Sequence, residues 1–223
     1  PGCYRDVKDT SAVAQFKVIE SSKGPFTVEG DLFLLAWTTT PWTLPSNTAL
    51  TVGEKIEYVC VTTFNQYTHK KTNVVLAKSL VNYQFSKGFF AVDGLDELAS
   101  YNPGDKKIPY FIGDSCTGKD LVGIRYEQLL DYCLPDEHPE EAFRVIPGDF
   151  VTTEDGTGIV HTAPTFGADD AKVAKEASPE VPPMLVLDKG NNPMPLVDLQ
   201  GRFREELGEF GGKYVKNEYY DEG

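Results

Sequence analysis

A short apolar run that ends in a threonine- and proline-rich segment most constrains how this chain can fold. Residues 32–36 have the length and composition of a buried strand. The next segment, residues 37–47, reads WTTTPWTLPSN and follows neither a helical nor an alternating pattern. Pro41 and Pro45 restrict its backbone. The sequence therefore predicts a strand that feeds a rigid polar segment at the edge of the core, which we call the threonine ledge (residues 38–47).

The threonine ledge has two interpretations. Threonine is a good strand residue, and Pro-Trp corners occur in ordinary loops, so the segment could be purely structural. The consecutive hydroxyl groups of Thr38, Thr39 and Thr40 instead favour a site that holds a small polar ligand. Such hydroxyls can hold a substrate and a water molecule, but they are weak nucleophiles without a neighbouring base.

A second polar motif lies much later in the chain. Residues 156–164 read GTGIVHTAP, and a segment of helical composition, residues 169–177, follows soon after. A histidine inside an apolar strand, such as His161, is most often a satisfied core residue. Acidic side chains in a first helical turn, here Asp169 and Asp170, are stabilised there by about 0.3–1 kcal/mol each. We expect Asp169 to be the cap, and capping would keep a carboxylate ionised.

Composition limits the classes of function. The 223 residues suffice for one substantial domain, and the formal net charge of -13 argues against a self-sufficient nucleic-acid binder. The four cysteines show no CxxC pair and no Cys/His cluster, so neither a zinc site nor a disulfide framework is predicted. Reduced thiols indicate the cytoplasm. No apolar run is long enough to span a bilayer.

Short periodic segments separated by turn residues run through most of the chain. Helices are predicted at 79–85, 95–101, 169–177 and 204–210, and 105–116 gives no clear signal. Strands 48–52 and 55–63 should form a hairpin across Gly53-Glu54. The pattern favours a mixed α/β, β-rich class with a closed or strongly curved sheet and short helices. The strands are predicted at 13–20, 31–38, 48–52, 55–63, 73–77, 119–126, 143–152, 159–162 and 184–187.

The two polar motifs together resemble the editing domain, also called CP1, of the isoleucyl-tRNA synthetase family. Residues 38–47 resemble the threonine-rich peptide of that domain, and residues 156–170 resemble its other editing motif. Valyl and leucyl relatives carry Arg-Pro after two threonines, whereas Thr40-Pro41-Trp42 stands here, which favours the isoleucyl assignment. Residues 121–126 also resemble the family's Leu-x-Gly-x-x-Tyr segment.

This resemblance implies a β-barrel-like domain spanning residues 1–223, excised from a larger synthetase, with 1–10 and 217–223 as linker ends. It implies hydrolysis of the ester of valyl-tRNA(Ile), with valyl-adenylate as a further candidate substrate, and exclusion of isoleucine. The implied partners are the tRNA(Ile) 3′ end carrying valine and the catalytic domain of the same synthetase. We expect a monomer with no membrane contact and no metal or cofactor in this domain. ATP and Mg would act in the parent enzyme.

The resemblance also implies roles for single residues. Asp170 aligns with the aspartate that holds the amino group of the misattached amino acid. His161 would line the side-chain pocket and exclude isoleucine, or bond the terminal ribose. Thr38, Thr39 and Thr40 would face the scissile ester. The other candidates are Asn47 for the terminal adenosine or the water, Thr43 for the substrate, Trp37 and Trp42 as the frame of the pocket, and Gly156 and Gly158 for a turn or a close backbone approach.

Two other classes of function are compatible with parts of the sequence. The same residues could form a non-hydrolytic binding module for an aminoacylated 3′ end or a small amino acid. An unrelated esterase is a third reading, but the G-x-S-x-G signature of a serine nucleophile is absent.

Overall fold

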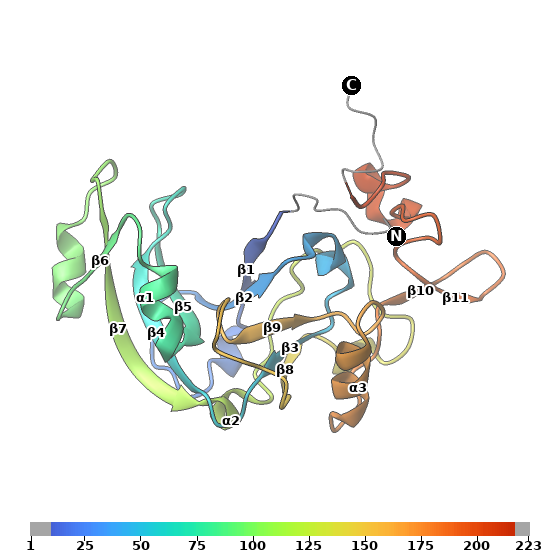
Figure 1. The fold of residues 1–223 in the computed structure, drawn as a ribbon, viewed down its shortest axis with the longest axis horizontal. Helices are drawn as coiled ribbons and strands as arrows, with labels where there is room; N and C mark the ends of the chain where they lie inside the picture. Colours follow the sequence, from blue (N-terminus) through green and yellow to red (C-terminus); the bar gives the residue numbers. More distant parts are fainter. Residues whose placement is uncertain (1–9, 217–223) are drawn as a thin grey trace, which may run out of the picture.

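The chain folds into a set of short strands that curve around a shared core (Figure 1). The computed structural model describes residues 10–216, so the expected linker ends lie outside the described residues, apart from Thr10. No helix within that range is long and apolar enough to cross a membrane. The strands are β1 Ala12–Lys17, β2 Leu32–Thr38, β3 Ala49–Val52, β4 Glu57–Phe64, β5 Lys71–Ala77, β6 Phe89–Ala91, β7 Ile108–Thr117, β8 Arg144–Pro147, β9 Ile159–Thr162, β10 Leu185–Leu187 and β11 Pro193–Pro195.

Helices are short and lie outside the sheet. The longest, α3, follows β9 directly, as predicted for residues 169–177. The α-helices are α1 Val81–Gln84, α2 Gly118–Leu121 and α3 Ala168–Glu176. The 3-10 helices are η1 Glu20–Ser22, η2 Pro41–Ser46, η3 Lys78–Leu80, η4 Leu95–Ser100, η5 Pro139–Glu141 and η6 Glu205–Phe210.

Strand β2 lies at the centre of the sheet. Among the described residues, nine strands form one mixed sheet in the order β6-β7-β4-β5-β2-β9-β3-β8, and β1 pairs with β2. β2 runs parallel to β5 and β9 and antiparallel to β1. A strand with neighbours on both sides reads as a continuous apolar run, because both of its faces are covered. Leu32, Leu34 and Ala36 are fully buried accordingly.

The predicted barrel-like curvature is confirmed. Residues 123–127 connect the two ends of the β1-β2-β9-β3-β8 ladder through single bridges. Tyr126 pairs with Val18 just after β1, and Arg125 pairs with Arg144 of β8. The segment thereby closes the sheet into a ring, which removes two exposed edges. The remaining strands, β4 to β7, extend away from the ring, and β7 is visibly bent (Figure 1).

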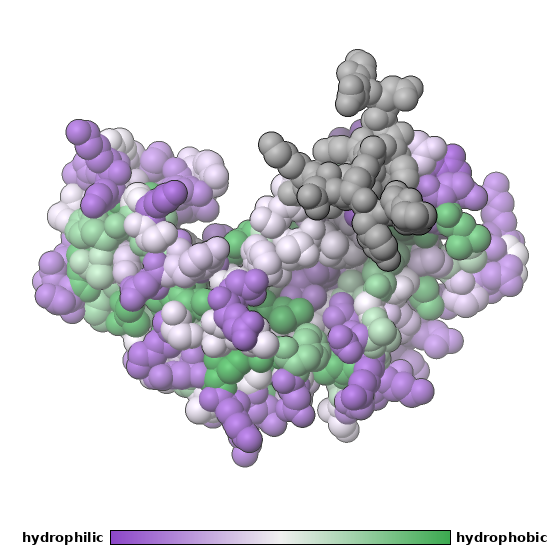
Figure 2. Space-filling view, viewed as in Figure 1, coloured by the Kyte–Doolittle hydropathy of each residue, from purple (hydrophilic) through white to green (hydrophobic). Residues whose placement is uncertain are grey.

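The buried apolar residues of the described part of the chain form four clusters, of which the main one lies inside the ring and the second lies against β4 and β5. The main cluster includes Phe16, Leu34, Leu50, Tyr126 and Ile159. The second gathers Val59, Leu76, Phe85 and Tyr110, among others. Figure 2 shows hydrophilic side chains at the tips of the projecting ends, with hydrophobic residues visible along the lower middle and in the left-hand lobe of this face.

Strands 48–52 and 55–63 exist, but the predicted hairpin between them is wrong. β3 pairs with β8 and β9, whereas β4 pairs with β5 and β7. Helix α2 occupies the turn between them, because Lys119 N–H donates to the Glu54 carbonyl and Gly118 N–H to that of Ile56. Both strands are buried on both faces. Their apolar pattern therefore shows that they are strands, but it does not show which strands they pair with.

The predicted strand at 119–126 is also wrong for most of its length. Thr117 and Asp120 begin α2 instead, with the Thr117 Oγ1 and N–H both donating to Asp120 Oδ2 at 2.7 and 2.9 Å. Gly123 then turns the chain at a φ of +89°. Strand β7, in contrast, spans a region without a clear sequence signal, since only its first residues are buried.

The central position of β2 predicts a large cost for cavities in it. Leu34→Ala should lower the free energy of unfolding by about 2–5 kcal/mol, because a fully buried side chain leaves a void that the ring cannot fill. Leu199→Ala removes the same atoms at a fully exposed position and should change stability by less than about 0.5 kcal/mol. Urea unfolding of both variants measures the difference. Equal losses would contradict the assigned core.

Candidate functional site

One cavity brings the two polar motifs together. It has a volume of about 360 Å³ and lies between the end of β2, η2, the turn before β9 and the start of α3. The pairing of Trp37 with Val160 holds the two motif strands side by side. Its lining includes Trp37, Thr38, Thr39, Thr40, Trp42, Thr43, Phe150, Asp155, Gly156, His161, Phe166 and Asp170. We call this cavity the motif pocket.

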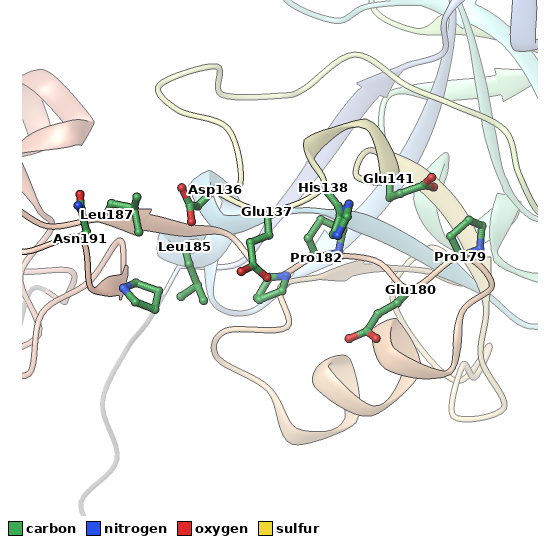
Figure 3. Close-up of a pocket in the computed structure, with 12 residues that line it drawn as sticks. Asp136, Glu137, His138, Glu141, Pro179, Glu180, Pro182, Leu185, Leu187 and Asn191 are labelled. Atoms are coloured by element: carbon green, nitrogen blue, oxygen red, sulfur yellow. The ribbon is translucent and has the colours of Figure 1, made fainter.

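A larger cavity, of about 840 Å³, lies elsewhere, along β10 and residues 136–141. Figure 3 shows Asp136, Glu137 and Glu180 among the residues that line it, together with Pro179 and Pro182. None of the predicted site residues belongs to this lining. The motif pocket is therefore the better candidate site despite its smaller volume.

The threonine ledge forms one wall of the motif pocket. Thr40 N–H donates to Thr38 Oγ1 at 3.0 Å, and the two hydroxyl oxygens lie 3.4 Å apart. η2 begins directly afterwards, with Pro41 in its first turn, where the missing N–H costs nothing. Thr39 is exposed, whereas Thr38 is buried. The corner thus presents several neutral hydroxyl groups on a backbone with little freedom.

His161 lies at the back of the pocket and is 6 % exposed. Its Nε2 is 2.9 Å from Thr43 Oγ1, and its Nδ1 is 2.9 Å from Asn47 Nδ2. Burial lowers the pKa of the imidazole to about 4. The ring is therefore neutral at pH 7, with both nitrogens occupied by protein groups, which argues against a general base. Sequence reasoning identified no group that orients His161, and the structure supplies two.

Asp170 lies at the N-terminal end of α3 and lines the motif pocket. Its Oδ2 accepts the Ala163 N–H at 2.8 Å. Gly167 makes room for this fold-back, since a Cβ there would lie 3.0 Å from the Asp170 carboxyl carbon. Burial raises the pKa of Asp170, the Ala163 N–H opposes this, and the charge of Asp169 adds to it.

The expectation that Asp169 caps the helix is wrong. The N-cap residue is Gly167, with no side-chain cap, and Asp169 is exposed in the first turn. Capping is also expected to keep a carboxylate ionised, but this does not apply to Asp170. Burial raises its pKa by more than its single backbone hydrogen bond lowers it. α3 thus turns its second aspartate, rather than its first, toward the pocket.

Aromatic rings frame the pocket. Trp37 packs against the turn before β9, where a Cβ on Gly156 would lie 2.9 Å from Trp37 Cε3. Gly156 and Gly158 both have positive φ, of 70° and 74°, so the turn itself requires glycine. Trp42 meets Phe166 edge to face, with centroids 5.2 Å apart. The rings supply apolar surface next to the hydroxyl groups of the threonine ledge.

The structure thus brings together most of the predicted site residues. Trp37, Thr38, Thr39, Thr40, Thr43, His161 and Asp170 all line the motif pocket, as does Trp42. Asn47 does not line it, because its side chain is 3 % exposed and lies behind His161. Sequence reasoning missed Phe150 and Asp155, which come from the irregular segment before β9 and carry no motif signal.

The lining also defines what chemistry is available. Asp155 and Asp170 are its ionisable acids, and no lysine or arginine is among the lining residues. Within residues 10–216, no group of three or more His, Cys, Asp or Glu side chains could hold a metal ion. The pocket therefore suits a small cationic group next to an uncharged polar group.

The fold is that of CP1 editing domains of aminoacyl-tRNA synthetases. The crystal structure of GlLeuRS-CP1 is similar at a TM-score of 0.55, covering 93% of this chain and 91% of that one, with 15% identity. The P. falciparum cytosolic leucyl-tRNA synthetase editing domain is similar at a TM-score of 0.52 over 94% of this chain and 83% of that one, with 12% identity. The chain matches no family model.

In sequence, the chain is similar to isoleucine–tRNA ligases. It is 55% identical to that ligase from Cytophaga hutchinsonii and 52% identical to the one from Porphyromonas gingivalis, each over 98% of this chain. A relative from Clostridium tetani is 39% identical over the same share. The chain spans 19%, 20% and 17% of these three relatives. It is therefore homologous to one segment of the isoleucine–tRNA ligases.

Burial of His161 adds a pH dependence to stability. The pKa of the imidazole is 6.5 in the unfolded chain and about 4 in the folded protein. Between pH 4 and pH 6.5, His161 therefore binds a proton in the unfolded chain but not in the folded protein. The stability from the neutral imidazole is complete above pH 6.5 and is lost as the pH falls toward 4. We expect the free energy of unfolding to fall by about 1.4 kcal/mol per pH unit in this window. Chemical denaturation measures it.

The matched control is His161→Gln, which keeps polarity without a titrating ring. Asp170 contributes with the opposite sign, because its raised pKa makes the folded chain bind more protons just above pH 3.8. The difference between wild type and variant cancels that contribution. Parallel pH profiles for the two proteins would contradict a neutral buried His161.

Proposed function

We propose that this domain edits misacylated tRNA by hydrolysing the ester of valyl-tRNA(Ile), with valyl-adenylate as a second substrate, and that it excludes isoleucine. The observation that carries the proposal is that Asp170 and the hydroxyl groups of Thr38–Thr40 lie in one pocket whose lining has no lysine or arginine. Homology to a segment of isoleucine–tRNA ligases and the editing-domain fold support the same function.

Asp170 is the proposed anchor for the α-ammonium group of the amino acid. One oxygen is held by Ala163 N–H, which fixes the carboxylate while leaving the other oxygen for a ligand. An ammonium group next to a half-buried carboxylate favours its ionised form, which offsets the raised pKa of the empty site. The anchor recognises a free amino group, which an aminoacyl ester has.

The ester lies against the threonine ledge in this proposal. Thr39 and Thr40 offer hydroxyl groups at the pocket surface, where they can hold a water molecule and stabilise the developing oxyanion. An aminoacyl ester is intrinsically reactive, so correct placement of water supplies much of the required acceleration. His161 stays neutral and does not remove the proton.

The walls of the pocket select the side chain. One methylene changes binding in an apolar pocket by only about 10- to 200-fold, a general limit for which isoleucine against valine is the established example. A second pocket that admits valine is therefore useful to an isoleucine-specific enzyme. The rings of Trp37 and His161 limit the space at the back of the motif pocket.

The proposed partners follow from charge and size. The tRNA(Ile) 3′ end would reach the pocket, and the parent synthetase would hold the rest of the tRNA, because this chain has a net charge of -13. The catalytic domain of the same synthetase is the other proposed partner, and it would use ATP and Mg. A monomeric state and a cytoplasmic location remain predictions.

Asp170→Asn should reduce kcat/KM for valyl-tRNA(Ile) hydrolysis by about 10- to 100-fold, since it removes the charge that pairs with the ammonium group. The amide keeps the size and an acceptor for Ala163 N–H. Release of free valine in the parent synthetase is the measurement.

Asp169→Asn is the matched control, because it makes the same change at the exposed neighbouring position. It should leave kcat/KM within about twofold of wild type. Equal effects of the two variants, or unchanged hydrolysis in Asp170→Asn, would overturn the assignment of Asp170 as the anchor.

A further inference from the structure

Tyr126 donates a hydrogen bond from the core toward the motif pocket without lining it. Its side chain is 1 % exposed and meets Phe16 edge to face, with centroids 5.2 Å apart. The residue belongs to the segment that closes the ring of strands. Its hydroxyl donates to Asn47 Oδ1 at 2.7 Å. A core tyrosine thus uses its only O–H on a residue behind the pocket.

The orientation of Asn47 follows from its other partner. The Ala49 carbonyl, 2.8 Å away, can only accept, so the nearby Asn47 atom is the amino nitrogen. That nitrogen is also 2.9 Å from His161 Nδ1. Nδ1 must therefore accept and carry no proton, because two donors cannot face each other at this distance. The neutral ring then carries its proton on Nε2.

The hydrogen bonds on the Nε2 side of the His161 ring also have a fixed direction. His161 Nε2–H donates to Thr43 Oγ1 at 2.9 Å, which leaves the Thr43 hydroxyl to donate to the Thr40 carbonyl at 2.8 Å. Thr43 N–H donates to that carbonyl as well, at 3.0 Å. The other side of Thr40 is held by its N–H bond to Thr38 Oγ1. The corner between β2 and η2 is thus fixed from both directions.

We propose that Tyr126 is a positioning residue for ester hydrolysis, because it begins a one-directional hydrogen-bond relay, Tyr126 to Asn47 to His161 to Thr43 to Thr40, that places the threonine ledge. This inference rests on the proposed editing function. It also assigns His161 a single tautomer with no free ring nitrogen. His161 therefore acts on the substrate through the shape of its ring, and bonding of the terminal ribose is not its role.

The relay depends on each donor being present. Without the Tyr126 hydroxyl, Asn47 Oδ1 is a buried acceptor without a donor, which is unfavourable in an apolar environment. The Ala49 carbonyl still favours the same orientation of Asn47, but the amide is then held from one side only, so its constraint on the His161 tautomer is weaker. Replacing the Asn47 amide by a carboxylate has a stronger effect. An acceptor facing Nδ1 requires a proton there, which reverses the two hydrogen bonds of His161, while Tyr126 still donates to residue 47.

Histidine ¹⁵N spectra read the relay directly, and the chain has three histidines. In the wild type at pH 7, we expect one His161 signal pair, with Nε2 protonated and Nδ1 unprotonated. Tyr126→Phe should give a mixture of tautomers, and Asn47→Asp should give a protonated Nδ1. Tyr110→Phe is the matched control, since it removes a hydroxyl from the second core cluster and should match wild type.

Kinetics in the parent synthetase test the positioning role. Tyr126→Phe should lower kcat for valine release by about 10-fold, because a less firmly held threonine ledge places the ester and the water less precisely. KM should change by less than about twofold, because the groups that bind the substrate remain. Tyr110→Phe should change neither constant. Unfolding curves of each variant confirm that the compared proteins are folded.

The outcomes separate the relay from the function. A wild-type His161 with protonated Nδ1, or a Tyr126→Phe variant with wild-type kcat, would overturn the relay while leaving the editing function in place. An Asn47→Asp variant with an unprotonated Nδ1 would overturn it even where Tyr126→Phe does not fold. A wild-type enzyme that releases no valine would instead overturn the proposed function, and the spectra would still decide whether the relay exists.

Discussion

The pairing of β2 with β9 is the interaction on which the rest of the site depends. Trp37 and Val160 are matched in a parallel ladder although more than half of the chain separates them. Their alignment puts the corner after β2 beside the strand that carries His161, and the helix that follows that strand brings Asp170 to the same cavity. A slip of one residue would turn His161 to the opposite face and dismantle the pocket.

Burial of polar groups is the second constraint, and it explains why the pocket is rigid. Asn47, Thr43 and His161 are all almost fully buried, so each needs partners inside the protein. These three residues form hydrogen bonds with one another, with the Ala49 carbonyl and with the Tyr126 hydroxyl. A network in which every member is satisfied has few alternative arrangements. Polar residues that look like ligand contacts in the sequence thereby become the support for those contacts.

Much of the fold could be predicted from local pattern, while the pairings could not. The apolar run of β2 and the composition of α3 identify those elements directly, because each is a local property. The hairpin after Gly53 was wrong because a strand buried on both faces does not reveal its partner. The two motifs predicted most of the residues that line the motif pocket. The inward position of Asn47 and its hydrogen bond to Tyr126 could not be predicted, because they arise only when residues 123–127 close the ring of strands.

The central claim is that the motif pocket hydrolyses the wrong ester and spares the correct one. Its most direct test is the release of free amino acid from valyl-tRNA(Ile) and isoleucyl-tRNA(Ile) under identical conditions in the parent synthetase. We predict that valine is released at least about 10-fold faster, as expected for one methylene in a close-fitting pocket. Equal release of both amino acids, or binding of a non-hydrolysable valyl-adenosine analogue with no release of valine from the ester, would contradict it.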